Sequence, residues 1–552
     1  MRYKKLTLPT IGFTFLLFIL HAVSQPSDLQ NAKLRFTDIT TELGIEFRHT
    51  NGERGEKYFI EPIGSGVALF DFDNDGDLDL YFVNGSTLPK VDTPMPPTNV
   101  LYRNDEGVFT DVTNEASVGD TGYGLGCCVG DYNNDGFTDL YVTNYGANVL
   151  YRNNGDSTFT DVADIAAVAG DQFSSGCAFV DVDADGYLDL YIVNYVQFDP
   201  ATNPECTRQG VRTYCTPEAL PGSVDILYRN NGDGTFTDIS EKAGVGTTSG
   251  KGLGVVCGDI DNDGDADIFV ANDTTPNFLY RNERDSLKMT EDALFAGVAL
   301  SEEGRAYSGM GANLGDFDND GYLDIVITNF QDQTNSLYHN AQGGFFNEVS
   351  FAKGVGERSL PYLAWGVDFV DFNNDGWLDL FVANGHLDDN IAEIDPIGTY
   401  PQSNQLFLNN RGINFSEIPD ATIAQRKVSR GTAFGDIDND GDVDVVISNL
   451  KDSPTVLRND GVNTSQWLSV KLIGTHCNRD AIGARVTVVS GGLTQIREVK
   501  SGSGYLSQND LRLHFGLADA ARVDTLTVRW LCGKRQTLQN VETNQVLVIS
   551  EK

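Results

Sequence analysis

Hydrophobic residues come in short runs along this chain, and the runs recur in a fixed order. The first clear pair, VALF and LDLYFV, lies on either side of an acidic segment that begins at Asp71. These runs are rich in β-branched and aromatic residues and are bounded by turn-forming residues, which is typical of strands rather than helices. We therefore predict two strands joined by a tight acidic loop.

The acidic segment and its flanking strands occur seven times. The copies are DFDNDGDLDL from Asp71, DYNNDGFTDL from Asp131, DVDADGYLDL from Asp181, DIDNDGDADI from Asp259, DFDNDGYLDI from Asp316, DFNNDGWLDL from Asp371 and DIDNDGDVDV from Asp436. A glycine stands five residues before each first aspartate: Gly66, Gly126, Gly176, Gly254, Gly311, Gly366 and Gly431. An asparagine stands thirteen residues after it: Asn84, Asn144, Asn194, Asn272, Asn329, Asn384 and Asn449. Such regularity indicates a structural repeat rather than chance acidic turns.

Two further strands complete the repeat. A third strand of the LYRN type ends at Asn104, Asn153, Asn230, Asn282, Asn340, Asn409 and Asn459. A fourth, of the FTDVT type, begins at Phe109, Phe159, Phe236, Phe346 and Phe415, and is degenerate in the fourth repeat. Four strands repeated radially predict an all-β fold, a seven-bladed β-propeller over residues 33–462. The seventh repeat lacks its fourth strand, so we expect the FTDIT segment at 36–40 to complete that blade. The repeated glycine fits the innermost strand, where side chains around a central channel would collide.

Each acidic segment has the composition of a cation-binding loop. Positions 1, 3, 5 and 9 are Asp or Asn in every copy, position 6 is always Gly, and position 7 varies, as expected if it binds through its carbonyl oxygen. Position 12 is Phe82 in the first copy and Val142 in the second, where an EF-hand needs Glu, so we interpret the loop as a hairpin connection. We predict about seven bound Ca²⁺ ions, one for each loop.

The candidate metal ligands are residues 1, 3, 5, 7 and 9 of each loop: Asp71, Asp73, Asp75, Asp77 and Asp79; Asp131, Asn133, Asp135, Phe137 and Asp139; Asp181, Asp183, Asp185, Tyr187 and Asp189; Asp259, Asp261, Asp263, Asp265 and Asp267; Asp316, Asp318, Asp320, Tyr322 and Asp324; Asp371, Asn373, Asp375, Trp377 and Asp379; and Asp436, Asp438, Asp440, Asp442 and Asp444.

Composition and the N-terminus bear on location. The 552 residues carry a formal net charge of −40, which excludes nucleic acid as a partner because phosphate binding needs a basic surface. A basic start, an apolar run at 11–20 and small residues at Ala22 and Ser24 predict a signal peptide over residues 1–24. A membrane anchor is the rival interpretation, but the run is short for a span of about 20 residues. We expect a secreted protein (periplasmic or on the cell surface in a bacterium) with no membrane span after signal removal.

The repeats resemble the FG-GAP repeats of the integrin α-subunit propeller, whose calcium loops lie in hairpins on one face. From Trp467 to Glu551, the segments NRDAIGARVTV, GSGYLSQND, LRLHFGL, VDTLTVRW and NQVLVIS resemble the ASPIC/UnbV domain. The combination resembles the cartilage acidic protein family. No EGF-like module follows Lys552, so the resemblance implies the shorter, bacterial-type form. It also implies an extracellular calcium-binding role, and a small all-β domain over residues 466–552.

The eight cysteines fall into two groups. We predict disulfides between Cys206 and Cys215, which share a Pro-rich insert, and between Cys477 and Cys532, the two cysteines of the C-terminal domain. Four others lie on predicted innermost strands, where we expect buried free thiols: Cys127, Cys128, Cys177 and Cys257.

Three readings of function stay open. Long inserts at Gly85–Thr98, Tyr195–Val224 and Gly385–Ser403 should lie on the face opposite the calcium loops, where they could bind an extracellular protein or glycan, as in an adhesion module. The candidate residues on this ligand face are Arg48, His49, Asn51, Glu61 and His386. Alternatively, acids near His49 or His386 could serve an extracellular hydrolase, although HExxH, GxSxG and P-loop motifs are absent. In the third reading the inserts only cover the ring and calcium is purely structural.

Overall fold

A computed structural model describes residues 34–88, 95–283, 287–461 and 465–552. The predicted signal peptide, residues 1–24, lies outside these ranges. Strands dominate, and the helices are single turns. Within the described ranges no helix has the length and apolar character needed to cross a membrane.

Seven antiparallel four-stranded sheets of the repeat region follow one plan: six run in chain order from first strand to fourth, and the seventh takes β1 (Phe36–Asp38) as its fourth strand. The first holds β2 (Val67–Phe70), β3 (Asp79–Phe82), β4 (Val100–Asp105) and β5 (Val108–Asp111). The second holds β6 (Tyr123–Gly130), β7 (Asp139–Tyr145), β8 (Val149–Asn153) and β9 (Phe159–Asp161). The third holds β10 (Ser174–Val180), β11 (Asp189–Asn194), β14 (Ile226–Asn230) and β15 (Phe236–Asp238). The fourth holds β16 (Gly252–Gly258), β17 (Asp267–Asn272), β18 (Phe278–Glu283) and β19 (Lys288–Glu291).

The fifth sheet holds β20 (Ala312–Gly315), β21 (Asp324–Ile327), β22 (Ser336–Asn340) and β23 (Phe346–Glu348). The sixth holds β24 (Ala364–Val370), β25 (Asp379–Asn384), β27 (Gln405–Asn409) and β28 (Phe415–Glu417). The seventh holds β30 (Ser429–Gly435), β31 (Asp444–Asn449), β32 (Thr455–Asn459) and β1 (Phe36–Asp38). In this last sheet Phe36 pairs with Asn459, so the N-terminal segment occupies the expected edge.

The first strands of neighbouring sheets contact one another in a closed series. β2 contacts β6, and the series continues through β10, β16, β20 and β24 to β30, which contacts β2 again. The repeated glycines allow this approach. A Cβ added to Gly254 would lie 2.6 Å from the carbonyl oxygen of Met310, and one on Gly366 would lie 2.7 Å from that of Arg430. The inner strands can therefore pack closely only because this position carries no side chain.

Hydrophobic side chains fill the space between neighbouring sheets. Phe70 and Tyr81 of the first sheet pack with Val129 and Leu140 of the second, and this arrangement recurs around the series. Short helices follow the fourth strands in five sheets: α2 (Thr113–Ala116), α3 (Ala163–Ala166), α4 (Ser240–Ala243), α5 (Ala293–Ala296) and α6 (Gly356–Ser359). A 3-10 turn, η3 (Val245–Thr247), follows α4.

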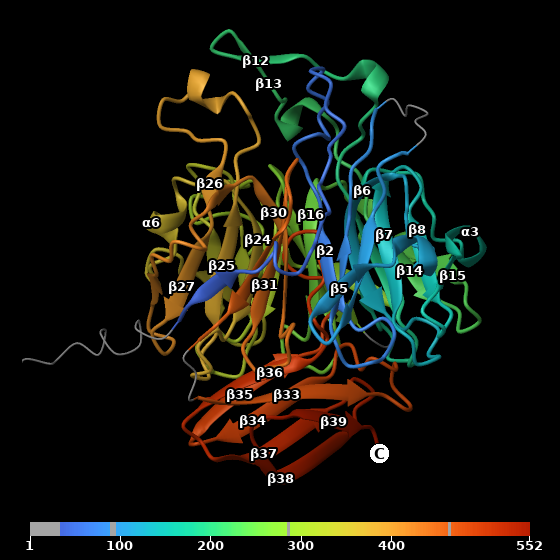
Figure 1. Cartoon of the computed structure of the whole chain (residues 1–552), viewed down its shortest axis with the longest axis vertical. Coiled ribbons are helices and arrows are strands. Elements are labelled where there is room, and N and C mark those ends of the chain that lie inside the picture. The colour runs from blue at the N-terminus through green and yellow to red at the C-terminus, as the bar shows by residue number, and fades with distance from the viewer. Residues whose placement is uncertain (1–33, 89–94, 284–286, 462–464) are drawn as a thin grey trace, which may run out of the picture.

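The C-terminal domain consists of two further sheets. One is ordered β36 (Leu513–Ala518), β33 (Gln466–Ile473) and β39 (Val546–Ser550), with β33 and β39 parallel. The other is ordered β35 (Leu493–Glu498), β34 (Arg485–Ser490), β37 (Arg522–Arg529) and β38 (Arg535–Glu542). Figure 1 shows this domain at one end of the repeat region, with the hairpin of β12 (Cys206–Arg208) and β13 (Val211–Thr213) at the opposite end.

A segment of the C-terminal domain, residues 501–508, enters the centre of the ring of inner strands. We call it the plug; all of its residues are buried. Its backbone completes hydrogen bonds of several sheets: Leu69 N–H donates to the Gln508 carbonyl (3.0 Å), Cys127 N–H to that of Leu506 (3.1 Å), and Ala312 N–H to that of Gly504 (3.0 Å). Unpaired backbone groups of buried strands are costly. The plug therefore fills the central channel expected from the sequence and satisfies inner-strand groups that face it.

We predict that Gly66→Ala destabilises the protein by displacing the plug. An added Cβ would lie 1.7 Å from the carbonyl oxygen of Leu506, and backbone cannot yield as a flexible side chain does. We expect a loss of about 2 kcal/mol or more in the free energy of unfolding, measured by denaturant titration. Gly119→Ala is the matched control, because its Cβ would meet only side-chain atoms at 3.1 Å and beyond. Equal stability of the two variants would contradict the role of the plug.

Candidate metal loops and the opposite loop face

Each acidic loop joins the first strand of its sheet to the second. The glycine at position 6 has positive φ in every loop, from 88° at Gly376 to 104° at Gly264. Six loops have Asn at position 4 with positive φ as well, and the third has Ala184 there. Asn and Gly tolerate this left-handed conformation better than other residues do. The repeated NDG sequence thus produces the turn that folds the acidic side chains together.

The first aspartate of the loop accepts hydrogen bonds from the turn itself. In the second loop Asp131 accepts from the N–H of Asp135 (3.0 Å) and of Gly136 (2.7 Å). The same pair of bonds recurs at Asp181, Asp316, Asp371 and Asp436.

The ninth residue, an aspartate in all seven loops, is buried and held on both oxygens. Asp324 accepts from Asn340 N–H (2.8 Å) and from Phe317 N–H (3.1 Å). Equivalent bonds form at Asp79, Asp139, Asp189, Asp267, Asp379 and Asp444. This residue therefore links its loop to the third strand of the same sheet.

The carboxylates of the loops are crowded and incompletely paired. Ligand-type oxygens of Asp71, Asp73 and Asp79 lie within 4.8 Å of one another, as do those of Asp181, Asp183 and Asp189. Buried Oδ1 atoms lack a hydrogen-bond partner among the described residues at Asp71, Asp73, Asp183, Asp259 and Asp318.

Burial also makes the charged form of these acids unfavourable. It raises the pKa of Asp181 to about 7, with repulsion from Asp185 as the second cause, and the pKa of Asp371 to about 8. Crowded, buried oxygen donors fit a hard divalent cation, which would balance charge that the loops cannot balance themselves.

Basic side chains already offset part of this charge. From the third strands, Arg229 pairs with Asp183 and Asp185 (both 2.7 Å), and His339 lies 3.0 Å from Asp318. From the C-terminal domain, Arg529 pairs with Asp259, and Lys471 lies 3.4 Å from Asp71. A cation in these loops would share its carboxylates with an ammonium, guanidinium or imidazole group.

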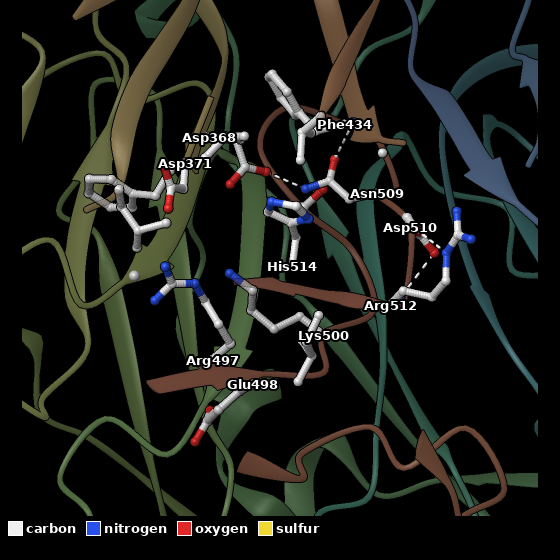
Figure 2. A pocket seen from close by; sticks show the side chains of 18 of the residues that line it. Asp368, Asp371, Phe434, Arg497, Glu498, Lys500, Asn509, Asp510, Arg512 and His514 are labelled. Atoms are coloured by element: carbon white, nitrogen blue, oxygen red, sulfur yellow. Dashed lines mark hydrogen bonds and ion pairs between the residues drawn. The ribbon is translucent and has the colours of Figure 1, made fainter. Parts of the chain in front are cut away.

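The C-terminal domain covers the face that carries the acidic loops, which the sequence patterns did not indicate. A cavity of about 130 Å³ lies between the two. Figure 2 shows Arg497 and Lys500 of the C-terminal domain facing Asp371 and Asp368 across it. On the same face His514 Nε2 lies 2.6 Å from Asn374 Oδ1, and Arg512 donates to Asn439 Oδ1 (2.9 Å). One signal was available: many basic residues of this acidic chain are concentrated in the C-terminal domain.

At the opposite end, two long inserts and the segment leading into the first sheet form one layer, the loop face. The Tyr195–Val224 insert carries η1 (Pro200–Thr202), the β12–β13 hairpin and η2 (Pro217–Ala219). The Gly385–Ser403 insert carries η5 (Ile391–Glu393) and β26 (Gln402–Ser403), which pairs with β29 (Arg426–Lys427). They meet where Tyr214 N–H donates to Asp388 (3.0 Å) and Asn390 donates to the Arg212 carbonyl (2.9 Å). In the Gly85–Thr98 insert, residues 89–94 lie outside the described ranges.

The five ligand-face candidates lie at this end, but four of them are buried. His49, Asn51, Glu61 and His386 are each at most 3% exposed, and only Arg48 reaches solvent, where it pairs with Asp452 (3.2 Å). They were expected to touch a ligand. Instead, packing of the inserts over the first sheet turns four of them into internal hydrogen-bonding groups.

Both histidines act as hydrogen-bond acceptors for the backbone. His49 Nδ1 accepts from Lys451 N–H (3.2 Å), and His386 Nδ1 accepts from Asp388 N–H (3.0 Å). Burial lowers the pKa of His49 to about 3 and that of His386 to about 4; Arg430 adds to the effect at His49, and Arg208 at His386. Both imidazole rings therefore stabilise the fold by accepting backbone hydrogen bonds.

The buried Arg430 was missed by the sequence analysis. It precedes the glycine of the seventh repeat, stacks on Trp365 at 4.0 Å, and donates to the carbonyl of Pro62 (2.8 Å). It thus ties the entry segment of the first sheet to the seventh sheet.

A cavity of about 360 Å³ opens beneath the inserts of the loop face. Its walls include the disulfide-bonded hairpin, aromatic side chains of three sheets and insert residues, and the carboxylate of Asp273. The disulfide Cys206–Cys215 staples this hairpin, and Cys477–Cys532 staples the C-terminal domain, as predicted. Cys127, Cys128, Cys177 and Cys257 are free and buried, as predicted.

Comparison with known proteins identifies the family. The FG-GAP-like repeat model matches residues 71–142, 131–192, 219–270, 259–327 and 316–382, more than half of the chain. The ASPIC and UnbV model matches residues 474–552. The chain therefore belongs to the FG-GAP-like repeat proteins, and it carries a C-terminal ASPIC and UnbV domain.

Among its relatives is cartilage acidic protein 1. The chain is 31% identical to the Homo sapiens protein over 348 residues, 60% of this chain and 48% of that protein. It is 29% identical to the Xenopus tropicalis protein over 332 residues, 57% of this chain and 47% of that protein. The chain thus spans about half the length of the curated relatives it matches.

One similar solved structure is that of an Agrocybe aegerita lectin, which recognises non-reducing terminal N-acetylglucosamine. It is 15% identical to this chain, with a TM-score of 0.41, and the match covers 70% of this chain and 86% of that chain. Similarity of that size carries no functional weight.

We predict that the two buried histidines make stability fall as the pH drops. Their pKa values are lower in the folded state than the unfolded value of about 6.5, so the folded state binds fewer protons and loses stability as the pH falls below about 6.5. Each contributes a slope of up to about 1.4 kcal/mol per pH unit. In the double variant His49→Asn/His386→Asn, whose Oδ1 atoms can replace the Nδ1 acceptors, this part of the slope should vanish. Denaturant titrations between pH of about 4 and 7 measure it, and each single variant should remove part of the slope. Parallel curves for wild type and double variant would contradict the assignment.

Proposed function

We propose that the chain is an extracellular, calcium-binding β-propeller that acts as a binding module, with its ligand site on the loop face. In this proposal the seven sheets are the blades of one propeller over residues 33–462. Residues 466–552 form the C-terminal domain, and residues 1–24 direct export. The closed series of inner-strand contacts and the pairing of β1 with β32 support the propeller. The two disulfides support an oxidising compartment.

The observation that carries the binding role is the difference between the two ends of the repeat region. The C-terminal domain packs on the acidic-loop face and leaves only parts of the loops exposed, such as residues 74–76 and 438–440. The loop face carries the inserts, a disulfide-stapled hairpin and a cavity of about 360 Å³. Inserted loops on a rigid repeat scaffold are common places for recognition. A protein or glycan ligand therefore fits this end best.

Calcium in the acidic loops is the second part of the proposal. Its support is the set of crowded carboxylates whose buried oxygens lack partners. Residues 1, 3, 5, 7 and 9 of each loop would hold the ion, the seventh through its carbonyl group. Bound calcium would supply positive charge to a face that basic residues balance only in part.

We predict that millimolar calcium stabilises the protein strongly and that EGTA reverses this. With dissociation constants of about 10⁻⁴–10⁻³ M, each site would add about 1 kcal/mol, because the ion binds only the folded loop. Thermal unfolding in calcium and in EGTA, with bound metal counted in parallel, should show a large shift and about seven ions. In Asp73→Asn/Asp75→Asn the count should fall by one, whereas Asp105→Asn, outside the loops, should leave it unchanged. No shift, or a single ion, would contradict the calcium loops.

We predict that the inserts carry ligand binding. Replacing residues 196–223 and 386–402 by short Gly/Asn turns should abolish binding to any member of a glycan array or a panel of purified matrix proteins that the wild type binds. Replacing the β8–β9 connection at 154–158 by a Gly/Asn turn is the control, since it lies outside the inserts. Calcium stabilisation of each variant reports that its ring has folded. Full binding by the insert-free variant would overturn the site.

A further inference from the structure

The repeat brings equivalent residues of neighbouring sheets together at the mouth of the ring on the loop face. One such position immediately follows the repeated asparagine near the end of the second strand. Its occupants are Gly85, Tyr145, Tyr195, Asp273, Phe330, Gly385 and Leu450. Six are glycine, apolar or aromatic, and Asp273 is the single charged residue of the set. Tyr195, Asp273 and Phe330, from three consecutive sheets, all line the cavity of about 360 Å³.

The two carboxylate oxygens of Asp273 differ in their hydrogen bonding. The Tyr195 hydroxyl donates to Oδ2 (2.6 Å). Oδ1 is buried and has no hydrogen-bond partner among the described residues, although the residue as a whole is only 8% exposed. Burial raises the pKa of Asp273 to about 6, and the hydroxyl groups of Tyr195 and Ser308, together with the charge of Lys251, oppose that rise. A buried carboxylate oxygen without a hydrogen-bond donor is unfavourable unless a ligand supplies one.

The basic residues nearby are engaged elsewhere or lie at the rim. Lys251 acts electrostatically on Asp273, but its ammonium group donates to the carbonyl oxygen of Pro217 (2.7 Å). Arg430 stacks on Trp365 and donates to backbone carbonyls. Arg208 lines the cavity from the exposed side of the β12–β13 hairpin. The hydrogen bonds of Lys251 and Arg430 are therefore made away from Oδ1.

Much of the remaining wall suits an apolar or aromatic body, and the charged residues Arg208, Glu218 and Asp388 also line it. Phe59, Tyr195, Tyr214, Phe330 and Trp365 line the cavity together with Leu253 and Met310. Leu253, Met310 and Trp365 each precede the repeated glycine, so the register that builds the ring also presents them to this space. Aromatic faces attract cations as well as apolar groups. The cavity volume fits a small molecule rather than a folded domain.

We propose that this cavity binds a small primary amine with an aromatic or apolar body, with its ammonium group on the carboxylate of Asp273. An ammonium group supplies the missing donor and neutralises the carboxylate at once, whereas a hydroxyl group supplies only the donor. The amine can be free or can be part of a larger ligand of the loop face. In the second case the inference deepens the proposed function and rests on it.

The test uses benzylamine, with benzyl alcohol as a neutral analogue and benzoate as an anionic one, titrated calorimetrically into the full-length protein in calcium. Benzylamine should bind at least about tenfold more tightly than benzyl alcohol, and benzoate should not bind measurably, because a charge-assisted bond to a buried carboxylate is worth about 1.5–3 kcal/mol. Asp273→Asn should weaken benzylamine at least about tenfold and leave benzyl alcohol within about twofold. Glu205→Gln, which changes an exposed acid on the Tyr195–Val224 insert, is the matched control.

A second variant tests the cavity independently, in case Asp273→Asn does not fold. Leu387→Trp, at the cavity wall, should exclude both benzylamine and benzyl alcohol while calcium stabilisation persists. Equal affinities for amine and alcohol, or amine binding that Asp273→Asn leaves unchanged, would overturn the inference. If benzylamine fails to bind but insert-dependent binding to glycans or matrix proteins persists, the amine site is wrong and the proposed function stands. If amine binding holds while insert-dependent binding is absent, the reverse is true.

Discussion

Seven asparagine side chains, one at the end of each third strand, donate hydrogen bonds to the loop of the preceding sheet. The bonds run from Asn104 to Ile437, Asn153 to Phe72, Asn230 to Tyr132, Asn282 to Val182, Asn340 to Ile260, Asn409 to Phe317 and Asn459 to Phe372. Five loop asparagines donate the other way, to the glycine of the following loop. All seven acidic loops are therefore held by the following sheet and five of them also by the preceding loop, and the positions of the carboxylates depend on these bonds. A buried amide that satisfies two sheets at once also makes their spacing hard to change.

The acidic face imposes the second constraint, which is charge. Carboxylates folded together by the turns repel unless positive groups approach them. The structure supplies some of these groups from third-strand arginines and others from the C-terminal domain, through Lys471, Arg497 and Arg529. The C-terminal domain is thus part of the electrostatic balance of the repeats as well as a cap on them. Removing it would expose acidic loops and open the centre of the ring together.

The periodic part of the structure could be predicted from the sequence, because each repeat carries its own strand, turn and spacing signals. The positions of Gly66 and its equivalents, the loop turns, the edge strand at Phe36 and both disulfides follow from local pattern and compartment. The rest depends on contacts with no period. No sequence pattern in the inserts predicts that His49, Glu61 and His386 are buried. The docking of the C-terminal domain depends on surfaces that are far apart in the chain. Asp273 could have been noticed in the sequence, because it is the single charged residue at the position that follows the repeated asparagine. A role for this residue becomes evident only from the cavity that it lines.

The pairing of Phe36 with Asn459, together with the entry of residues 501–508 into the ring, has a consequence for biosynthesis. β1 is synthesised first but pairs with the seventh sheet, which is synthesised much later. The inner strands bond to residues 501–508, which are synthesised later still. Contacts of such sequence separation form slowly. The seventh sheet therefore cannot form until Asn459 has been made, and the inner strands lack their central partner until residues 501–508 follow. The topology that closes the finished molecule thus delays its last pairings until most of the chain has been made.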